Sequence, residues 1–376
     1  MKNRICKKVL FTATVVKKHI NEFHLPYLRW FHDQGYEVWV AAKNDFDNPR
    51  DCMIPYCDHY VDIPFSRNPF SKDNIQAFKK LKKLIDDNNF TLIHTHTPVG
   101  SVITRLASKH SRRLGTKVIY TAHGFHFYNG ANWKNWLVYY PVEKYFSRYL
   151  DCLITINKED YERAKDSFYC ETRLVNGIGF SFEGRKDCPE FELSSVGISE
   201  QEPILTMVAE LNREKNQKVI MDAMSLLKKE GLTVQFLMVG DGKMKTEYQA
   251  YAERNGIAEQ THLLGYRKDV FSILKKTDIF VFPSLREGMP VSLMEAMYCG
   301  LPCIVNDTRG NRDLIDNDRG GYICQNDPGE YAKAIKKMLH SDTTAFGEYN
   351  RKKVDSFSIQ RVLPQVTEIY KQYLQD

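Results

Sequence analysis

Apolar runs alternate with helical patterns along the first half of this chain. Short apolar runs predict strands at 8–16, 36–42, 90–94, 117–121, Cys152–Ile156 and near Leu174, with helices at about 20–34, 71–87 and 99–114. Gly35 and Gly115 stand where two of these helices end. Because buried strands that alternate with helices are typical of a parallel sheet covered on both faces, we predict a doubly wound α/β domain.

The second half repeats this alternation. Between 176 and 203 the sequence is Gly-rich and acidic without clear periodicity, which predicts a linker. Beyond it, strands are expected at 204–209, 232–239, 261–264, 278–282, 301–305 and 320–324, and helices around 215–229, 242–254, 268–276, 290–299 and 327–339. The length of 376 residues also favours two domains. We place them at 1–178 and 179–357, followed by a last helical segment within 358–376.

The segment 278–302 carries the marks of an anion site. Pro290 fits the first turn of the predicted helix and Gly300 its end. Free N–H groups around Met289 to Ser292 would lie at the helix N-terminus, which favours a phosphate. Glu287 falls in the loop at the sheet's carboxyl edge, and Glu295 falls inside an otherwise apolar helix. Two carboxylates beside one anion site suit a nucleotide-sugar; the alternative is two ordinary surface glutamates.

This segment resembles the signature of the family 4 glycosyltransferases, which are retaining enzymes of the GT-B fold. The resemblance lies in Glu287-Gly288-Met289-Pro290 and in Glu295, which follows Glu287 after seven intervening residues. It implies two Rossmann-like domains that face each other across a cleft, the N-terminal one binding the acceptor and the C-terminal one the donor, with the last helix returning toward the first. It also implies that Glu287 contacts the donor sugar at the catalytic centre and Glu295 the ribose. The diphosphate would lie against Gly288, Met289, Pro290 and Val291.

Further donor-site residues are carried over from the same resemblance. Gly240, Asp241 and Gly242 follow a strand and resemble the loop beside the nucleotide, although alone they indicate only a tight turn. Tyr266, Arg267 and Val270 lie in the segment that resembles the one bordering the base.

The family clamps the diphosphate with an arginine and, five residues later, a lysine. Here Glu210 takes the arginine position and Lys215 the lysine position. Arg213 is close enough to substitute, and Arg213 with Lys218 repeats the spacing in a shifted register. The choice between Arg213, Lys215 and Lys218 stays open.

In the first half, His123 stands before Gly124 at a strand end and resembles the family's His-Gly element at the donor sugar, which makes it a catalytic candidate. His94 and His96 end the preceding predicted strand; we expect them on opposite strand faces and therefore not in a joint metal site. The paired glycines of the family's N-terminal loop are absent here. Phe23, His24 and His96 are instead the candidates for binding the acceptor.

Charge and aromatic residues point to a membrane surface. Residues 1–180 hold 27 Lys and Arg against 18 Asp and Glu, and residues 125–149 include ten aromatic side chains. Together with the lysine-rich helix at 79–83, these features fit an anionic membrane surface, although a solvated lysine face and core aromatic residues are the simpler explanations. There is no apolar run of about 20 residues, and the nine cysteines form no Cys-x-x-Cys pair. We therefore expect a cytoplasmic protein, peripheral on the inner face of the membrane.

The leading hypothesis is a hexosyl- or N-acetylhexosaminyltransferase that moves a sugar from a UDP-sugar to a lipid-linked saccharide in capsule or exopolysaccharide assembly. We expect no cofactor and no metal, since a helix N-terminus and a lysine would hold the diphosphate and no suitable Asp-x-Asp occurs. A nucleotide-sugar epimerase of similar fold is the enzymatic alternative, but the paired glutamates argue against it. A basic nucleic-acid-binding protein is the other, but no binding module is recognisable, so no nucleic-acid partner is expected.

Overall fold

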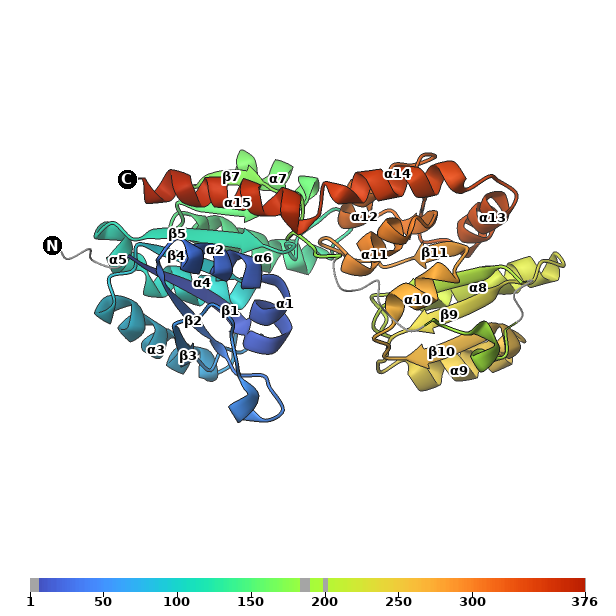
Figure 1. The fold of residues 1–376 in the computed structure, drawn as a ribbon, viewed down its shortest axis with the longest axis horizontal. Coiled ribbons are helices and arrows are strands. Elements are labelled where there is room, and N and C mark those ends of the chain that lie inside the picture. The colour runs from blue at the N-terminus through green and yellow to red at the C-terminus, as the bar shows by residue number, and fades with distance from the viewer. Residues whose placement is uncertain (1–6, 183–189, 199–201, 376) are drawn as a thin grey trace. The chain divides into compact units, whose positions relative to one another are not determined.

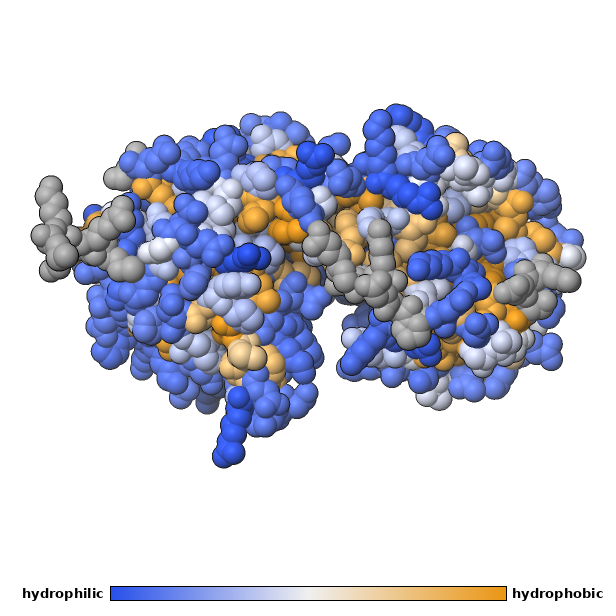
Figure 2. Space-filling model, in the orientation of Figure 1, coloured by the Kyte–Doolittle hydropathy of each residue, from blue (hydrophilic) through white to orange (hydrophobic). Residues whose placement is uncertain are grey.

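The computed structural model describes residues 7–182, 190–198 and 202–375. The chain divides into two compact units, Met1–Phe180 with Ile359–Asp376, and Ser181–Ser358. Each unit is a parallel sheet with helices on both of its faces (Figure 1). On the face seen in Figure 2 the surface of each unit is mostly hydrophilic, with small apolar areas between the polar side chains.

The first unit contains a seven-stranded sheet in the order β3-β2-β1-β4-β5-β6-β7. Its strands are β1 (Lys8–Val15), β2 (Glu37–Lys43), β3 (His59–Asp62), β4 (Leu92–His96), β5 (Lys117–Ala122), β6 (Cys152–Thr155) and β7 (Glu171–Leu174). The strand order reverses between β1 and β4, and ligands of such sheets bind at the carboxyl ends of strands beside this switch point. Strand β3 was not predicted, because this partly exposed edge strand has no apolar run.

The helices of this unit are η1 (Val16–Ile20), α1 (Asn21–Phe23), α2 (Leu25–Asp33), α3 (Asp73–Asp87), α4 (Pro98–Ala107), α5 (Lys109–Arg113), α6 (Trp133–Ser147), α7 (Lys158–Lys165) and α15 (Ile359–Leu374), with a short 3₁₀ turn η2 (Pro49–Asp51). The single helix predicted at 20–34 is broken. It begins as the π-helical turn η1 and restarts at α2, where Pro26 lies in the first turn. Proline has no N–H to donate, so a continuous helix through His24 would lose a hydrogen bond.

Helix α15 is part of the first unit's core. The Tyr370 hydroxyl lies 2.7 Å from Nδ1 of His94 on β4, and the Tyr370 ring packs against Phe31 of α2. Where the chain passes Gly179, whose φ is +73°, a Cβ atom would lie 2.6 Å from Ile359. Only glycine allows the chain and α15 to approach this closely at that conformation.

The second unit contains a six-stranded sheet in the order β10-β9-β8-β11-β12-β13. Its strands are β8 (Ile204–Val208), β9 (Gln235–Val239), β10 (Thr261–Gly265), β11 (Ile279–Phe282), β12 (Cys303–Asn306) and β13 (Gly321–Cys324). All six strands were predicted, and the order reverses between β8 and β11. This second switch point is where a ligand is expected.

The helices of the second unit are α8 (Gln217–Lys229), α9 (Lys245–Arg254), α10 (Val270–Lys275), α11 (Val291–Cys299), α12 (Arg309–Leu314), α13 (Pro328–Leu339) and α14 (Thr344–Asp355), with 3₁₀ turns η3 (Leu193–Val196) and η4 (Ala258–Gln260). Helices α12 and α14 were not predicted. Of the predicted linker, 183–189 and 199–201 lie outside the described residues, but Phe191, Leu193 and Ile198 are buried in a cluster with β8 and β9. That part of the predicted linker therefore belongs to the core. Among the described helices none is long and apolar enough to cross a membrane.

Candidate active site

A pocket of about 620 Å³ lies at the carboxyl edge of the second sheet, entirely within the second unit. Its lining comes from the ends of β8, β9 and β10, from α10 and from α11: Val208, Ala209, Glu210, Val239, Gly240, Asp241, Tyr266, Arg267, Lys268, Val270, Phe271 and Glu295. Six of the predicted donor-binding residues, Gly240, Asp241, Tyr266, Arg267, Val270 and Glu295, are therefore brought together. Arg213, Lys215, Gly242, Glu287 and the segment 288–291 are not part of this lining.

The loops around this pocket are held against one another by glycine. The Gly240 N–H donates to the Gly265 carbonyl at 2.8 Å, which joins the ends of β9 and β10. A Cβ atom on Gly240 would lie 2.0 Å from the Ala209 carbonyl oxygen, and one on Gly242 would lie 2.3 Å from that of Leu211. These glycines thus allow the loops after β8 and β9 to pack closely, a structural need that exists with or without a ligand.

Helix α11 forms one wall of the pocket. Pro290 is the N-cap and not the first helical residue as predicted, so α11 begins at Val291, and Gly300 ends it with φ at +78°. The first N–H to bond back to this turn is that of Met294, to Pro290, so the amides just before it make no bond within the helix. Glu295 is 5% exposed, as expected for a helix that is apolar nearly all round. A buried carboxylate at a pocket wall suits a ligand that donates hydrogen bonds.

Lys215 and Glu287 meet at the switch point of this sheet. Lys215 Nζ lies 2.5 Å from Glu287 Oε1, and both side chains are largely covered. The loops that carry them are joined again where the Leu285 N–H donates to the Glu214 carbonyl at 2.8 Å. Arg309 Nε donates to the Glu287 carbonyl at 2.9 Å and fixes the second loop. The pair therefore joins the loops after β8 and β11 through opposite charges.

The other two clamp candidates are placed differently. Lys218 pairs with Asp222 one turn along α8 at 2.8 Å, and its Nζ lies over the Tyr251 ring. Arg213 is exposed in the loop before α8. Glu210, at the position where the family carries arginine, is an exposed residue on the pocket lining. Of the three cations, Lys215 is the one joined to a predicted catalytic residue.

Arg267 forms an ion pair within its own loop. Its Nε lies 2.8 Å from Asp269 Oδ1, and its Nη2 lies 2.5 Å from Asp269 Oδ2. Hydrogen bonding within the pair raises the pKa of Arg267 and lowers that of Asp269. Tyr266 beside it is exposed. Part of this wall of the pocket is thus a loop with an internal ion pair and an exposed aromatic ring.

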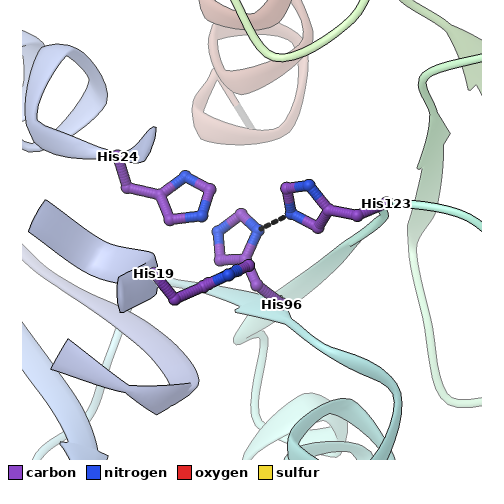
Figure 3. A group of neighbouring side chains, drawn as sticks. All are labelled: His19, His24, His96 and His123. Atoms are coloured by element: carbon purple, nitrogen blue, oxygen red, sulfur yellow. Dashed lines mark hydrogen bonds between the residues drawn. The ribbon is translucent and has the colours of Figure 1, made fainter. Parts of the chain in front are cut away.

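The first unit gathers four histidines at its own switch point (Figure 3). His19 and His24 follow β1, His96 ends β4 and His123 follows β5. His123 Nε2 lies 3.4 Å from His96 Nδ1. The Phe23 ring lies 5.6 Å from that of His19 and 6.4 Å from that of His123, centroid to centroid. The predicted residues His123, His24, His96 and Phe23 are therefore brought together. The member that was not predicted is His19.

The expectation for His94 and His96 was wrong. Residues two apart on a strand share a face, and the two rings lie 4.1 Å apart on β4. His94 is nevertheless engaged elsewhere, with Nδ1 at 2.7 Å from the Tyr370 hydroxyl and Nε2 at 2.8 Å from Thr121 Oγ1. It is a structural residue that ties α15 to the sheet.

Burial keeps these histidines neutral. It lowers the pKa of His123 to about 4 and that of His94 to about 3. For His19, His24 and His96, burial first and neighbouring histidines second lower the pKa well below its ordinary value. Near pH 7 each ring therefore carries one N–H and one free lone pair.

Two family models match the chain. The model described as Glycosyltransferase Family 4 matches residues 27–175, and the one described as Glycosyl transferases group 1 matches residues 190–353. Among solved structures, Anabaena Alr3699/HepE in complex with UDP and glucose has a TM-score of 0.74 at 16% identity, covering 97% of this chain and all of that one. The predicted GT-B fold is thereby confirmed.

Two relatives align with most of this chain. An Escherichia coli UDP-Gal:alpha-D-GlcNAc-diphosphoundecaprenol alpha-1,3-galactosyltransferase is 28% identical over 79% of this chain and 81% of its own. A Bacillus subtilis (strain 168) protein named as a glycosyltransferase, EpsD, is 39% identical over 98% of this chain and 97% of its own. Identity at this level over almost the whole of both proteins shows that the chain belongs to the family 4 glycosyltransferases.

Proposed function

We propose that this glycosyltransferase moves a hexose or N-acetylhexosamine from a UDP-sugar to a saccharide carried on a lipid diphosphate, as a step in capsule or exopolysaccharide assembly. The observation that carries the proposal is the pocket walled by α11, in which a buried carboxylate, Glu295, lies close to a helix N-terminus. The E. coli relative, whose name gives a UDP-sugar donor and a diphosphoundecaprenol acceptor, supports the choice of both substrates.

The donor would lie along the carboxyl edge of the second sheet. Glu295 accepts hydrogen bonds from the ribose hydroxyls, and Gly240, Asp241, Gly242, Tyr266, Arg267 and Val270 border the nucleoside. The N–H groups of Gly288, Met289 and Val291, together with Lys215, hold the diphosphate as negative charge develops on it during transfer. Stereochemical retention follows from the family.

The Lys215–Glu287 ion pair is expected to break when the donor binds. Without donor, the lysine is neutralised by the carboxylate at 2.5 Å. A diphosphate carries more negative charge than one carboxylate and attracts the ammonium group away from it. Glu287 is then free to accept hydrogen bonds from the donor sugar, so arrival of the diphosphate prepares the group that positions the sugar.

A donor panel tests this function. Purified full-length protein is incubated with UDP-hexoses, UDP-N-acetylhexosamines and GDP-mannose, with and without an N-acetylhexosamine linked to undecaprenyl diphosphate. We expect UDP release that depends on the lipid-linked acceptor, and a product larger by one sugar in mass spectrometry. The proposal is contradicted if GDP-mannose is the one donor in the panel that is turned over. It is also contradicted if UDP is released equally fast with and without the acceptor.

Helix α6 is the part of the first unit best suited to a membrane surface. Large apolar side chains on it face outward, with Trp133 66% and Leu137 68% exposed; Val138, Val142 and Tyr145 are exposed as well. Cations accompany the aromatic rings, with Lys109 Nζ at 4.2 Å from the Tyr149 ring centre and the Arg148 guanidinium at 4.2 Å from that of Tyr145. We propose that α6 lies on the anionic inner leaflet, a position that brings the enzyme to its lipid-linked acceptor.

The lysine-rich helix contributes less than expected. On α3, Lys82 pairs with Asp86 and Lys83 with Asp87, each one turn apart. These pairs neutralise part of the charge and fit an ordinary solvated face. Of the aromatic stretch, Phe125 and Phe127 belong to the core, so the surface role falls to α6.

Vesicle sedimentation tests the membrane proposal. Wild-type protein should bind vesicles that contain phosphatidylglycerol, and ~0.5 M salt should weaken this binding because it screens the cations. The double variant Trp133→Ala/Leu137→Ala should bind at least about tenfold more weakly, since each large apolar side chain that enters the interface contributes about 1.5–3 kcal/mol. The control Met53→Ala removes an exposed side chain elsewhere on the unit and should bind like wild type. Equal binding by all three proteins, or none to any vesicle, contradicts the proposal.

A further inference from the structure

The four histidines of the first unit form a cluster. Donor binding in the pocket of the second unit does not explain why they lie together. Their rings converge from three separate segments on the end of the sheet (Figure 3). His19 comes from η1, and π-helical turns occur frequently at functional sites. His24 follows it at the start of α2, while His96 and His123 end or follow the neighbouring strands β4 and β5.

Several ring nitrogens in this cluster are buried without a hydrogen-bond partner. Within the described part of the chain these are both ring nitrogens of His24, Nε2 of His96 and Nε2 of His19. His24 is 2% exposed and His96 is 1% exposed. Leaving a buried polar atom unpaired costs about 1–3 kcal/mol, so unpaired ring nitrogens on three neighbouring histidines indicate a missing ligand, which would bind one nitrogen of each ring. On the same strand face His94 has both ring nitrogens paired, so burial alone does not explain the unpaired ones.

The distances suit a single metal ion. One ring nitrogen from each histidine lies within 4.8 Å of the other three. Zinc bound by imidazole at about 2.0–2.1 Å in a tetrahedron separates its ligand atoms by about 3.3–3.4 Å. His96 Nδ1 and His123 Nε2 are hydrogen-bonded at 3.4 Å, which equals that edge, so these two nitrogens would bind the ion and Nε2 of His96 would not. The other rings would have to turn to reach this spacing, because those of His24 and His96 are stacked with their centroids 3.7 Å apart.

We propose that His19, His24, His96 and His123 together bind one divalent transition-metal ion, with Zn²⁺ as the best match. Four imidazoles without a carboxylate are ligands for zinc and its neighbours rather than for Mg²⁺ or Ca²⁺, which prefer oxygen. The low pKa of each ring, caused mainly by burial, keeps it in the neutral form that binds metal.

Such an ion would fix the segment that carries the proposed acceptor contact. It would join η1 and the start of α2 to β4 and β5, and Phe23 lies between two of the ligands in sequence. The proposal concerns the first unit alone and does not rest on the identity of the donor. From the sequence we expected no metal, because a helix N-terminus and a lysine would hold the diphosphate; the site proposed here is a different one. His123 would then bind the metal ion and would not be a free imidazole at the donor sugar.

Cobalt and zinc binding test this inference on the full-length chain, prepared without a histidine tag and stripped with EDTA. Co²⁺ should bind at one equivalent per chain with the intense visible bands of a tetrahedral site, and Zn²⁺ should displace it. His19→Gln and His96→Gln should each weaken Zn²⁺ binding at least about a hundredfold, since one of the four direct ligands is lost. The control His110→Gln changes an exposed histidine on α5 and should bind zinc like wild type.

Two further measurements keep the result decisive. UDP binding in EDTA should equal that of the zinc-loaded protein, because the donor pocket lies in the other unit. Near-UV circular dichroism and thermal unfolding verify that the first unit of each variant is folded. His19 and His123 are more exposed than His24 and His96. If His96→Gln fails to fold, the zinc affinity of His19→Gln therefore serves as the test. Absence of tetrahedral Co²⁺ bands in wild type, or zinc affinity unchanged in a folded His19→Gln, overturns the proposal.

Discussion

Glu287→Gln is expected to lower kcat/KM for sugar transfer at least about a hundredfold, the size of effect seen when one preorganised group at a reacting centre is removed. The side chain keeps its shape but loses its charge, so the loss reports on the carboxylate itself. Because both side chains are largely covered and Gln still accepts a hydrogen bond from Lys215, the free energy of unfolding should fall by no more than about 1.5–3 kcal/mol. Initial rates with the preferred UDP-sugar and thermal unfolding of the same samples measure both quantities.

The matched control for this variant is Glu259→Gln. Glu259 lies in η4 before β10, at the opposite end of the second sheet from the pocket, and it is exposed. It should transfer sugar at the wild-type rate. Turnover within about threefold of wild type in a folded Glu287→Gln would remove this carboxylate from the catalytic centre.

Most of the regular elements could be predicted because their signals are local. The inner strands of both sheets begin with or consist of short apolar runs that follow polar residues, and every residue of β4, β9 and β11 is indeed buried. β3 and α12 were missed since their pattern depends on tertiary packing: β3 is partly exposed at a sheet edge, and α12 has only six residues. The broken helix after β1 follows from Pro26, which the helical periodicity of 20–34 concealed.

The candidate site was predictable only where a motif carried it. Glu287, Glu295 and the glycines after β9 stand in recognisable segments, whereas the pairing of Lys215 with Glu287 joins residues 72 apart in the chain. No local pattern encodes that contact, so the sequence left three cations open. His19 was missed for the same reason: its relation to His96 and His123 exists only after β1, β4 and β5 become neighbours. The prediction that His94 and His96 lie on opposite strand faces was wrong for another reason: residues two apart on a strand share a face, so the sequence already contained the correct answer.

Lys215→Ala is expected to weaken UDP binding about ten- to a hundredfold, whereas Lys218→Ala should change it less than twofold. A charge-assisted hydrogen bond contributes about 1.5–3 kcal/mol, and Lys215 is the cation that lies beside Glu287 at the switch point. Lys218 is already paired with Asp222 along α8. Arg213→Ala should have a mild effect, because this side chain is exposed before the helix. Isothermal titration with UDP at constant salt measures all three dissociation constants.

The same titration shows whether Glu287 and the diphosphate of UDP compete for Lys215. If Glu287 holds Lys215 until the diphosphate arrives, Glu287→Gln should bind UDP more tightly than wild type although it no longer transfers sugar. This gain should vanish in the Glu287→Gln/Lys215→Ala double variant, since the carboxylate acts on UDP through the lysine. Glu210→Gln should also tighten binding, because it removes a negative charge from the pocket lining. Equal losses for Lys215→Ala and Arg213→Ala would show that both cations bind the diphosphate, and weaker UDP binding by Glu287→Gln would refute the competition.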